Sequence, residues 1–342
     1  MNLKKLSDHL KLSQTTVSRA LNGYPEVSEK TRQRVLLAAQ EMNYTPNARA
    51  KGLATGRAHA IGHIIPVSNQ HEMVNPVFGD FLSGAGVSYA AAGYEMVINL
   101  VEDQQQESLY RDICARRSVD GIIVHGPTMD DGRIKLLNQL GLPFVVHGRA
   151  SSVDARYSWL DTNNARAFER ASQFLLDLGH RRIALVNGLE HMDYAFRRRE
   201  AYCKTLENSG VSLNPDWMSS DEMTEINGYL SARRMLDTPD HPTAFLSSSM
   251  MMAIGIRRAI HEKGLELGRD VSIITHDDDL GYLKNGHDVP IFTATRSSVR
   301  EAGIRAAEML ISLIRNPAQG PLTEILEAEL IIGASTGPAP GR

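Results

Sequence analysis

The sequence predicts an all-α helix-turn-helix headpiece followed by an α/β body of two doubly wound parallel-sheet lobes. Three observations predict this fold class. Capped segments of helical periodicity fill the first 45 residues, apolar β-branched runs alternate with amphipathic segments from residue 60 onward, and 342 residues are too many for one ordinary core. We therefore expect a headpiece over residues 1–45, a hinge or linker over 46–58 and a body over 59–342.

The second helix of the headpiece carries the residues best suited to DNA. Ser13 is a good N-cap, and Val17, Ala20 and Leu21 recur at helical spacing, so they can face a core. The remaining faces carry side chains that suit base edges and phosphates, together with the cap itself: Ser13, Gln14, Thr15, Thr16, Ser18, Arg19 and Asn22. Taken alone, this segment is more typical of a small polar surface helix, and its neighbours reverse that interpretation.

Those neighbours complete a helix-turn-helix. A first helix over residues 3–10 is joined to the second by a tight turn at Lys11 and Leu12. Lys11 stands where glycine is usual, which costs about 1 kcal/mol if the residue is left-handed. A third helix, over residues 29–42, is capped by Ser28, and the side chains expected to close the core are Val35, Leu36, Ala39 and Met42.

Charge is distributed unevenly along the chain. Up to residue 60 there are ten Lys and Arg against four Asp and Glu, a net charge of +6. Because the whole chain has a net charge of −3, the remaining residues carry −9. A basic head on an acidic body confines polyanion contact to the head. No apolar run reaches the roughly 20 residues of a membrane span and no signal peptide is recognisable, so we expect a cytoplasmic protein with no membrane partner. Cys114 and Cys203 are expected to be buried free thiols.

In the body, strands and helices alternate. Strands are expected over residues 61–66, 95–101, 121–125, 143–147, 182–187, 243–247 and 271–276. Helices are expected over residues 78–91, 104–116, 134–140, 164–178, 195–209, 226–236, 251–263 and 300–314. Such alternation indicates parallel sheets covered on both faces, with a ligand cleft beyond the carboxyl ends of the strands. Loops near 158–164 and 292–296 are the expected crossovers between lobes.

Three spaced motifs resemble the headpiece of the lactose-repressor/galactose-repressor (LacI/GalR) family of bacterial transcription regulators. They are TVSRALNG at 16–23, VSEKTR at 27–32 and NYTPN at 43–47. The resemblance implies a body of the periplasmic-binding-protein type I fold and a homodimer on pseudo-palindromic operator DNA. The start MNLKKL looks most like rhizobial-type regulators of α-glucoside use. Residues 333–342 contain no leucine heptad, which favours a dimer over a tetramer.

The hinge of this family folds into a helix on the operator and wedges a leucine pair into the minor groove. By that resemblance Leu53 is the wedge, Asn47 and Ala50 flank it, and Tyr44 lies nearby. The segment is marked by glycine at two points, so by itself it should be only marginally helical. The alternative is that Leu53 is a linker residue that docks on the body.

Two cleft residues follow from the same resemblance. FRRREAY at 196–202 resembles an Arg-x-x-Gly-aromatic motif and selects Arg198 to bind effector oxygens, because a guanidinium can grip two hydroxyls. THDD at 275–278 selects Asp277 as the acceptor for sugar hydroxyls. The alternative for Arg198 is a solvated basic helix start, and a structural role is expected for His276.

The same resemblance implies further cleft residues, for each of which a packing role is the alternative. NPVF at 75–78 resembles a family Asn-Pro-Phe-Phe loop in which Phe78 forms one wall of the pocket, and the Gly148-Arg149 pair resembles one found in sugar-responsive members, so Arg149 is expected to face the cleft. Ser249 replaces a usual asparagine and keeps a hydroxyl for the ligand, whereas Met250 replaces an aspartate and cannot bind a sugar hydroxyl in its place. Met223 falls near a position where relatives carry an aromatic residue that stacks on the sugar. Either Trp159 or Phe292 is therefore expected to supply the stacking ring instead.

The predicted function is a transcriptional repressor of a sugar catabolic operon, which a small sugar between the lobes releases from its operator; the resemblance of the N-terminal residues points to α-glucosides. One alternative keeps the DNA-binding architecture but uses a nucleotide or protein co-repressor. A distant alternative is an α/β enzyme. The sequence contains no Gly-x-Gly-x-x-Gly after the first strand, no P-loop, no Gly-x-Ser-x-Gly and no paired metal-ligand spacing, so we expect no catalytic residue, cofactor or metal.

Overall fold

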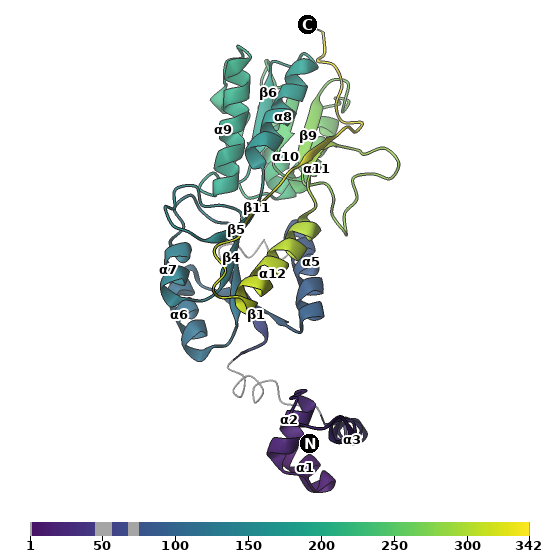
Figure 1. Ribbon diagram of the computed structural model, residues 1–342. Helices are drawn as coiled ribbons and strands as arrows, with labels where there is room; N and C mark the ends of the chain where they lie inside the picture. Colours follow the sequence, from purple (N-terminus) through teal and green to yellow (C-terminus); the bar gives the residue numbers. More distant parts are fainter. Residues whose placement is uncertain (1, 45–56, 68–74, 342) are drawn as a thin grey trace. The chain divides into compact units, whose positions relative to one another are not determined.

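A computed structural model describes residues 2–44, 57–67 and 75–341 of the chain. The chain divides into two compact units, Met1–His59 and Ala60–Arg342 (Figure 1). The first unit is entirely helical over its described residues, and the second is an α/β body with two sheets. This is the predicted fold class.

The helical unit contains the predicted helix-turn-helix and third helix. These are α1 (Leu3–Leu10), α2 (Gln14–Leu21) and α3 (Glu29–Glu41). Ser13 caps α2 by accepting from the Thr16 backbone N–H at 3.0 Å, and Ser28 caps α3 by accepting from Thr31 at 3.3 Å. Lys11 is left-handed, with φ 55°, so the turn carries the strain that the sequence indicated.

The headpiece core differs from expectation at one residue. Leu6, Val17 and Val35 are fully buried in it, as the periodicity predicts. Leu36, expected in the core, is 42% exposed, and Ala38 occupies the core instead. The reason is helical phase: Val35, Ala38, Ala39 and Met42 form one stripe at spacing i, i+3, i+4, i+7, whereas Leu36 lies beside it.

The first lobe of the body is built on a parallel sheet in the order β11-β5-β4-β3-β1-β2. Its strands are β1 (Ala60–Pro66), β2 (Glu95–Val101), β3 (Gly121–His125), β4 (Phe144–His147), β5 (Ser158–Thr162) and β11 (Thr323–Leu326). Its helices are α5 (Pro76–Ala92), α6 (Gln106–Arg116), α7 (Gly132–Leu140) and α12 (Val299–Arg315), and a 3₁₀ turn, η2 (Asp103–Gln105), precedes α6. In Figure 1, α12 lies beside α5, and the two helices pack together.

The second lobe repeats this design with the sheet order β12-β10-β9-β8-β6-β7. Its strands are β6 (Ile183–Asn187), β7 (Met218–Ser220), β8 (Ala244–Ser247), β9 (Ser272–His276), β10 (Thr293–Arg296) and β12 (Glu329–Ile331). Its helices are α8 (Asn164–Asp177), α9 (Asp193–Asn208), α10 (Glu225–Leu236) and α11 (Met250–Glu262), with a 3₁₀ turn, η3 (Pro215–Trp217). All strand pairs are parallel except β10 with β12, which departs from the all-parallel expectation.

The chain passes between the lobes at both predicted places, but the expected loops are strands. Residues 158–162 form β5 in the first sheet and lead into α8 of the second lobe, while residues 293–296 form β10 in the second sheet and lead into α12 of the first. A third passage runs from β11 to β12. Each lobe is therefore discontinuous in sequence, and the crossovers bring side chains from both lobes to one cleft.

Candidate functional site

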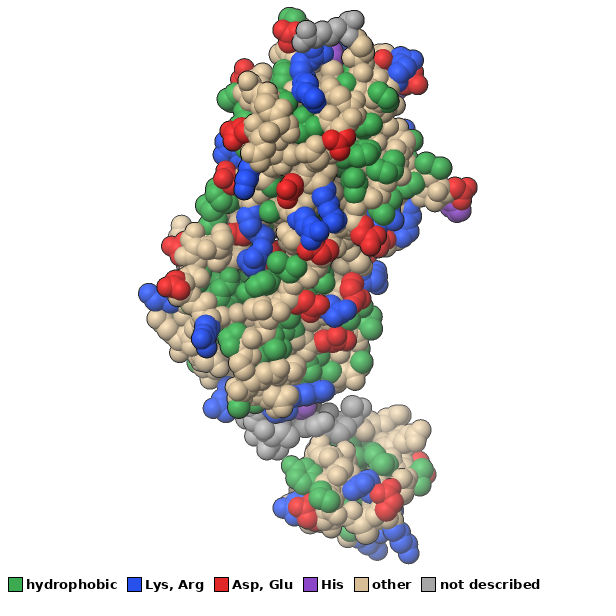
Figure 2. Space-filling model, turned by 45° about the horizontal axis from the view of Figure 1, so that its top comes forward, with side chains coloured by type: hydrophobic (Ala, Val, Ile, Leu, Met, Phe, Trp, Pro, Cys, Tyr) green, Lys and Arg blue, Asp and Glu red, His purple; other side chains and the backbone are tan. Residues whose placement is uncertain are grey.

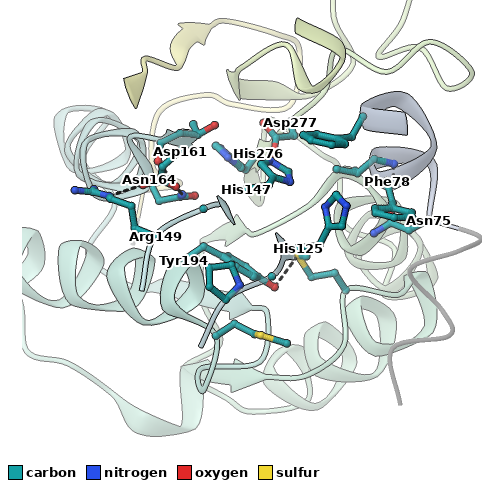
Figure 3. A pocket seen from close by; sticks show the side chains of 18 of the residues that line it. Asn75, Phe78, His125, His147, Arg149, Asp161, Asn164, Tyr194, His276 and Asp277 are labelled. Atoms are coloured by element: carbon teal, nitrogen blue, oxygen red, sulfur yellow. Dashed lines mark hydrogen bonds and ion pairs between the residues drawn. The ribbon is translucent and has the colours of Figure 1, made fainter. Parts of the chain in front are cut away.

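A cavity of about 180 Å³ lies between the two lobes. The first lobe contributes the carboxyl ends of β1, β3, β4 and β5 and the start of α5, and the second contributes α9 and the end of β9. Figure 3 shows the labelled side chains of both lobes around this space. We call it the inter-lobe cavity. It occupies the place that doubly wound sheets offer to ligands.

Arg198 is held by three kinds of contact on the second-lobe side of the cavity. Its Nε donates to Asn164 Oδ1 at 2.7 Å, and its Nη1 donates to the Ser248 carbonyl at 2.9 Å. The guanidinium also lies 4.8 Å from the ring centroid of Tyr194 and 5.1 Å from that of Phe168. Burial lowers the pKa of Arg198, although Asp277 opposes the shift. The guanidinium is therefore fixed in orientation before any ligand arrives.

Asp277 follows β9 directly and lines the same cavity. Its backbone is left-handed, with φ 54°, a conformation that Asp adopts more readily than most residues. One carboxylate oxygen, Oδ1, accepts from the Ser297 hydroxyl at 2.5 Å. Burial raises the pKa of Asp277 to about 6, while Arg198 and the Ser297 hydroxyl act in the opposite direction. The carboxyl is still mostly ionised at pH 7, so it acts chiefly as an acceptor.

Neutral histidines and aromatic rings form the first-lobe wall. His125 stacks on His63 with ring centroids 5.1 Å apart and meets the edge of Phe78 at 4.9 Å. His147 stacks on Phe81 at 4.2 Å. Burial lowers the pKa of His147 to about 4 and that of His125 well below its usual value. This wall is therefore uncharged at pH 7.

An ion-pair network joins the two lobes beside the cavity. Arg197 of α9 donates to Asp161 of β5 at 2.8 Å and to Asp193 at 2.6 Å. Asp161 also accepts from Arg149 at 2.8 Å, as the dashed line in Figure 3 shows. Asp193 accepts from the Ser151 backbone N–H at 3.0 Å. Both carboxylates are buried, so separating the lobes would require solvating these charges again.

The structure places four of the five predicted effector residues around the inter-lobe cavity: Phe78, Arg149, Arg198 and Asp277. Ser249 is not among the residues that line it. Its hydroxyl caps α11 by accepting from Met252 N–H at 3.3 Å, so the helix start uses the group that was expected to meet the ligand.

The stacking residues were also placed wrongly. Phe292 is buried in the second-lobe core, and Trp159 lies against the Arg149 guanidinium at 5.0 Å, whereas neither lines the cavity. Met223 does line it, and Tyr194 is the nearby aromatic ring that sequence reasoning missed. Tyr194 lies four residues before Arg198 on α9, so helical spacing could have indicated it.

Sequence reasoning also missed Asn164, His125 and His147. Asn164 was taken only as the start of a helix, yet it orients Arg198. Each histidine ends a strand, and only the sheet order brings β3 and β4 side by side. His276 lines the cavity as well; it is fully buried, and its Nδ1 lies 2.7 Å from the Thr295 hydroxyl.

On the headpiece, the predicted DNA-binding residues lie mainly on one helix. Ser13, Gln14, Thr15 and Arg19 are exposed, whereas Thr16, Ser18 and Asn22 are half-buried. The Asn22 amide is partly used, because it donates to the Ser18 carbonyl at 2.9 Å at the end of α2. Tyr44 packs against the headpiece core. The hinge residues Asn47, Ala50 and Leu53 lie outside the described residues.

Comparison with known proteins agrees with this architecture. Residues 9–47 match the bacterial regulatory proteins of the lacI family, and residues 172–336 match a periplasmic binding protein-like domain. The chain is 43% identical to the HTH-type transcriptional regulator AglR of Rhizobium meliloti (strain 1021), over 100% of this chain and 96% of the relative. The chain belongs to the LacI family. It is a helix-turn-helix transcriptional regulator and not an enzyme.

Two solved structures also resemble nearly the whole chain. The transcriptional regulator CelR in complex with cellobiose superposes with a TM-score of 0.72 at 25% identity, over 98% of this chain and 99% of that chain. The lac repressor dimer bound to operator and the anti-inducer ONPF gives 0.85 at 23% identity, with the same coverage. The second likeness shows that the fold is shared.

Three further features concern metals, membranes and thiols. Within the described ranges, no group of three or more His, Cys, Asp or Glu side chains is placed to hold a metal ion. No helix in those ranges is long and apolar enough to cross a membrane. Cys114 and Cys203 are free and half-buried, more exposed than expected.

Proposed function

We propose that this LacI-family protein is a homodimeric repressor of a sugar catabolic operon, released from its operator by a small sugar in the inter-lobe cavity. The observation that carries the proposal is the pairing of Arg198 with Asp277 in one cavity. Arg198 keeps N–H donors beyond those bonded to Asn164 and Ser248, and the Asp277 carboxylate accepts, so together they match sugar hydroxyls, which both donate and accept.

The rest of the cavity supports a neutral sugar over an anion. Arg149 is neutralised by Asp161, and Asp277 is the acid that acts most strongly on Arg198, so neither guanidinium among the described lining residues lacks a nearby carboxylate. Phe78 and Tyr194 provide aromatic surface on which the C–H face of a sugar can pack. The CelR structure was solved with cellobiose, a sugar of this class. We therefore favour a glucoside.

For DNA, the exposed start of α2 supports a major-groove role. Gln14 and Thr15 stand at its N-terminal end, the end of a recognition helix that reaches base edges. Lys and Arg side chains stand out on the face of the helical unit that Figure 2 shows. Arg19 and the flanking hydroxyls of Ser13, Thr16 and Ser18 then suit phosphates. Leu53, with Asn47 and Ala50 beside it, remains our proposed minor-groove wedge.

For the dimer, the edge of the first sheet is the proposed interface. β2 is an edge strand, and its Ile98 and Leu100 are 39% and 57% exposed. Val87 on α5, which packs beside β2, is 61% exposed. An unprotected apolar edge is unusual in a monomer and typical of an interface. A dimer also suits a pseudo-palindromic operator, and a regulator of this kind works in the cytoplasm.

The test is operator release by the full-length chain. Operators are first selected from a random DNA pool, and binding is then measured with glucosides, monosaccharides and purine nucleosides. We expect a glucoside to lower operator affinity for the parent protein and for Arg199→Ala, a neighbouring exposed arginine, but not for Arg198→Ala. A response of Arg198→Ala equal to that of the parent would contradict the assignment, and release only by nucleosides would replace the sugar by a nucleotide-type effector.

A further inference from the structure

A second cavity lies next to the inter-lobe cavity and belongs to no site described so far. It measures about 750 Å³ and lies between the first turns of α6 and α7, with the β6–α9 loop as its third wall. We call it the outer groove and define it by Gln106, Tyr110, Arg133, Gln139, His191 and Met192. Its walls thus come from both lobes, since His191 and Met192 belong to the second.

A thin wall separates the two cavities. Met192 pairs with Thr128 in an isolated antiparallel bridge, and the Asp193 backbone N–H donates to the Pro127 carbonyl at 3.0 Å. Pro66, Gly126 and Met192 line both spaces. A ligand in the outer groove therefore touches the same inter-lobe contact that a ligand in the inter-lobe cavity touches from the other side.

Two buried polar atoms of α6 at this groove lack a well-formed hydrogen bond among the described residues. The Tyr110 side chain is 0% exposed, and its hydroxyl lies beside the Arg133 guanidinium without a hydrogen bond of good geometry. The Gln106 side-chain oxygen, one helical turn earlier, has no hydrogen-bond partner among those residues. Buried polar groups in folded proteins are nearly always hydrogen-bonded, and an orphaned pair beside a cavity indicates that something polar completes it. Gln106 and Tyr110 are spaced i, i+4, so they share one helix face.

The charges of the groove favour a neutral ligand. Its three cationic side chains are balanced by three carboxylates, and two of the pairs are in direct contact: Arg133 with Asp131 at 2.6 Å and Arg111 with Glu107 at 2.7 Å. A phosphate would have to break these pairs. The amides, the Tyr110 hydroxyl and the apolar faces of Leu136 and Met192 instead match a sugar ring, which offers hydroxyls around a C–H face.

We propose that the outer groove is a second carbohydrate site, which takes one neutral glycosyl unit against Gln106 and Tyr110. The inference rests on the proposed sugar response. It also explains a mismatch of size, because the inter-lobe cavity of about 180 Å³ is smaller than the roughly 300 Å³ at which ligand sites usually begin. The glycosyl unit has two possible sources: the far end of an oligosaccharide whose first unit fills the inter-lobe cavity, or a separate saccharide.

Calorimetry on the full chain with glucose, disaccharides of glucose and maltotriose distinguishes these sources. Tyr110→Phe removes only the orphaned hydroxyl and keeps the buried ring, and Gln106→Ala removes the amide. Gln173→Ala is the matched control, an exposed glutamine on α8. If one oligosaccharide spans both spaces, each groove variant should weaken maltotriose or disaccharide binding by about three- to tenfold and leave glucose binding unchanged. If the ligands are separate, the parent binds two equivalents and the variants lose the second.

Two results would overturn the proposal. If saccharides bind the parent once and with the same affinity in both groove variants, the outer groove is not a carbohydrate site, while the sugar response stands. If no saccharide of the series binds the parent, the sugar response fails and the groove assignment fails with it. A thermal melting curve of each variant shows whether it is folded, so that a loss of saccharide binding is not mistaken for a loss of folding.

Discussion

At the scale of the residue, Asp277 shows a conflict between stability and binding. Without a ligand, the Asp277 carboxyl is buried near Arg198, and this burial raises the pKa of Asp277 from 3.8 to about 6. Because the folded state binds this proton more tightly than the unfolded state, the group favours folding most below pH 3.8, and that contribution is lost as pH rises through 6. At neutral pH the buried charge therefore costs stability, which a ligand that bonds to it can offset.

We expect Asp277→Asn to stabilise the body at pH 7.5 by about 3 kcal/mol, since the pKa of Asp277 is raised from 3.8 to about 6, one pKa unit corresponds to about 1.4 kcal/mol and asparagine carries no charge. Asparagine also tolerates the left-handed backbone here. Denaturant unfolding followed by tryptophan fluorescence reports on the body, because both tryptophans, Trp159 and Trp217, lie in it. The gain should disappear below pH 4, and a gain that is the same at pH 4 and 7.5 would contradict this account.

Resemblance to family motifs identified part of the cavity lining. Arg198 and Asp277 stand in short segments that match such motifs, so their place in the cavity could be predicted. Ser249 could not be placed in the same way, because whether its hydroxyl caps α11 or faces a ligand depends on the direction in which the strand ends. His125 and His147 gave no local signal, because a lone histidine at a strand end is usually structural.

At the scale of the element, α2 is specified by sequence more completely than any other part of the site. Ser13 supplies the cap, Val17 and Ala20 the buried face, and Gln14 and Thr15 the exposed start. The one local conflict is Lys11, held left-handed in the turn before α2. A left-handed non-glycine residue costs about 1–2 kcal/mol, so the turn is a weak point of the headpiece.

We expect Lys11→Gly to stabilise the headpiece by about 1 kcal/mol, because glycine adopts the left-handed conformation freely. Ser13→Ala should act in the opposite direction by about the same amount, since it removes the hydroxyl that accepts from Thr16. Hydrogen exchange of the α1–α3 amides in the full chain measures both. Core amides should exchange about fivefold more slowly in Lys11→Gly, and unchanged or faster exchange would show that the turn is not strained.

Strands β5 and β10 illustrate where element prediction stops. Their sequences, SWLDT and TATR, lack the apolar β-branched run that marked the other buried strands, and they were interpreted as crossover loops. They are strands because neighbours on both sides supply backbone partners: β4 and β11 for β5, and β9 and β12 for β10. Only the assembled sheets provide those partners.

At the scale of the whole molecule, the proposed repression requires two headpieces on one DNA site, so dimerisation would set operator affinity. The apolar edge formed by Val87, Ile98 and Leu100 is the proposed interface. The lobes themselves are joined by the ion pair of Arg197 with Asp161 and by the hydrogen bond from the Ser151 backbone N–H to Asp193. A ligand can shift the operator equilibrium only by its different affinity for the two lobe arrangements.

We expect Leu100→Asp to convert the dimer into a monomer and to lower operator affinity by at least about 100-fold, because the second half-site contact is lost. Leu100 lies on an edge strand and is 57% exposed, so the substitution should leave the fold of the lobe intact. Tyr282→Asp is the control, at a residue that is 94% exposed in the segment between β9 and β10. Sedimentation velocity gives the mass. A Leu100→Asp protein that remains dimeric would place the interface elsewhere.

The sequence by itself determined the helix-turn-helix, the alternation of strands and helices, and the two residues, Arg198 and Asp277, that motif and chemistry mark together. Caps, periodicity and short motifs are local, and local interactions decide them. The tertiary structure alone decided that Asn164 orients Arg198, that His125 and His147 line one wall and that a second groove lies behind Met192. Those features join residues far apart in the chain, and only the packing of two discontinuous lobes brings them together.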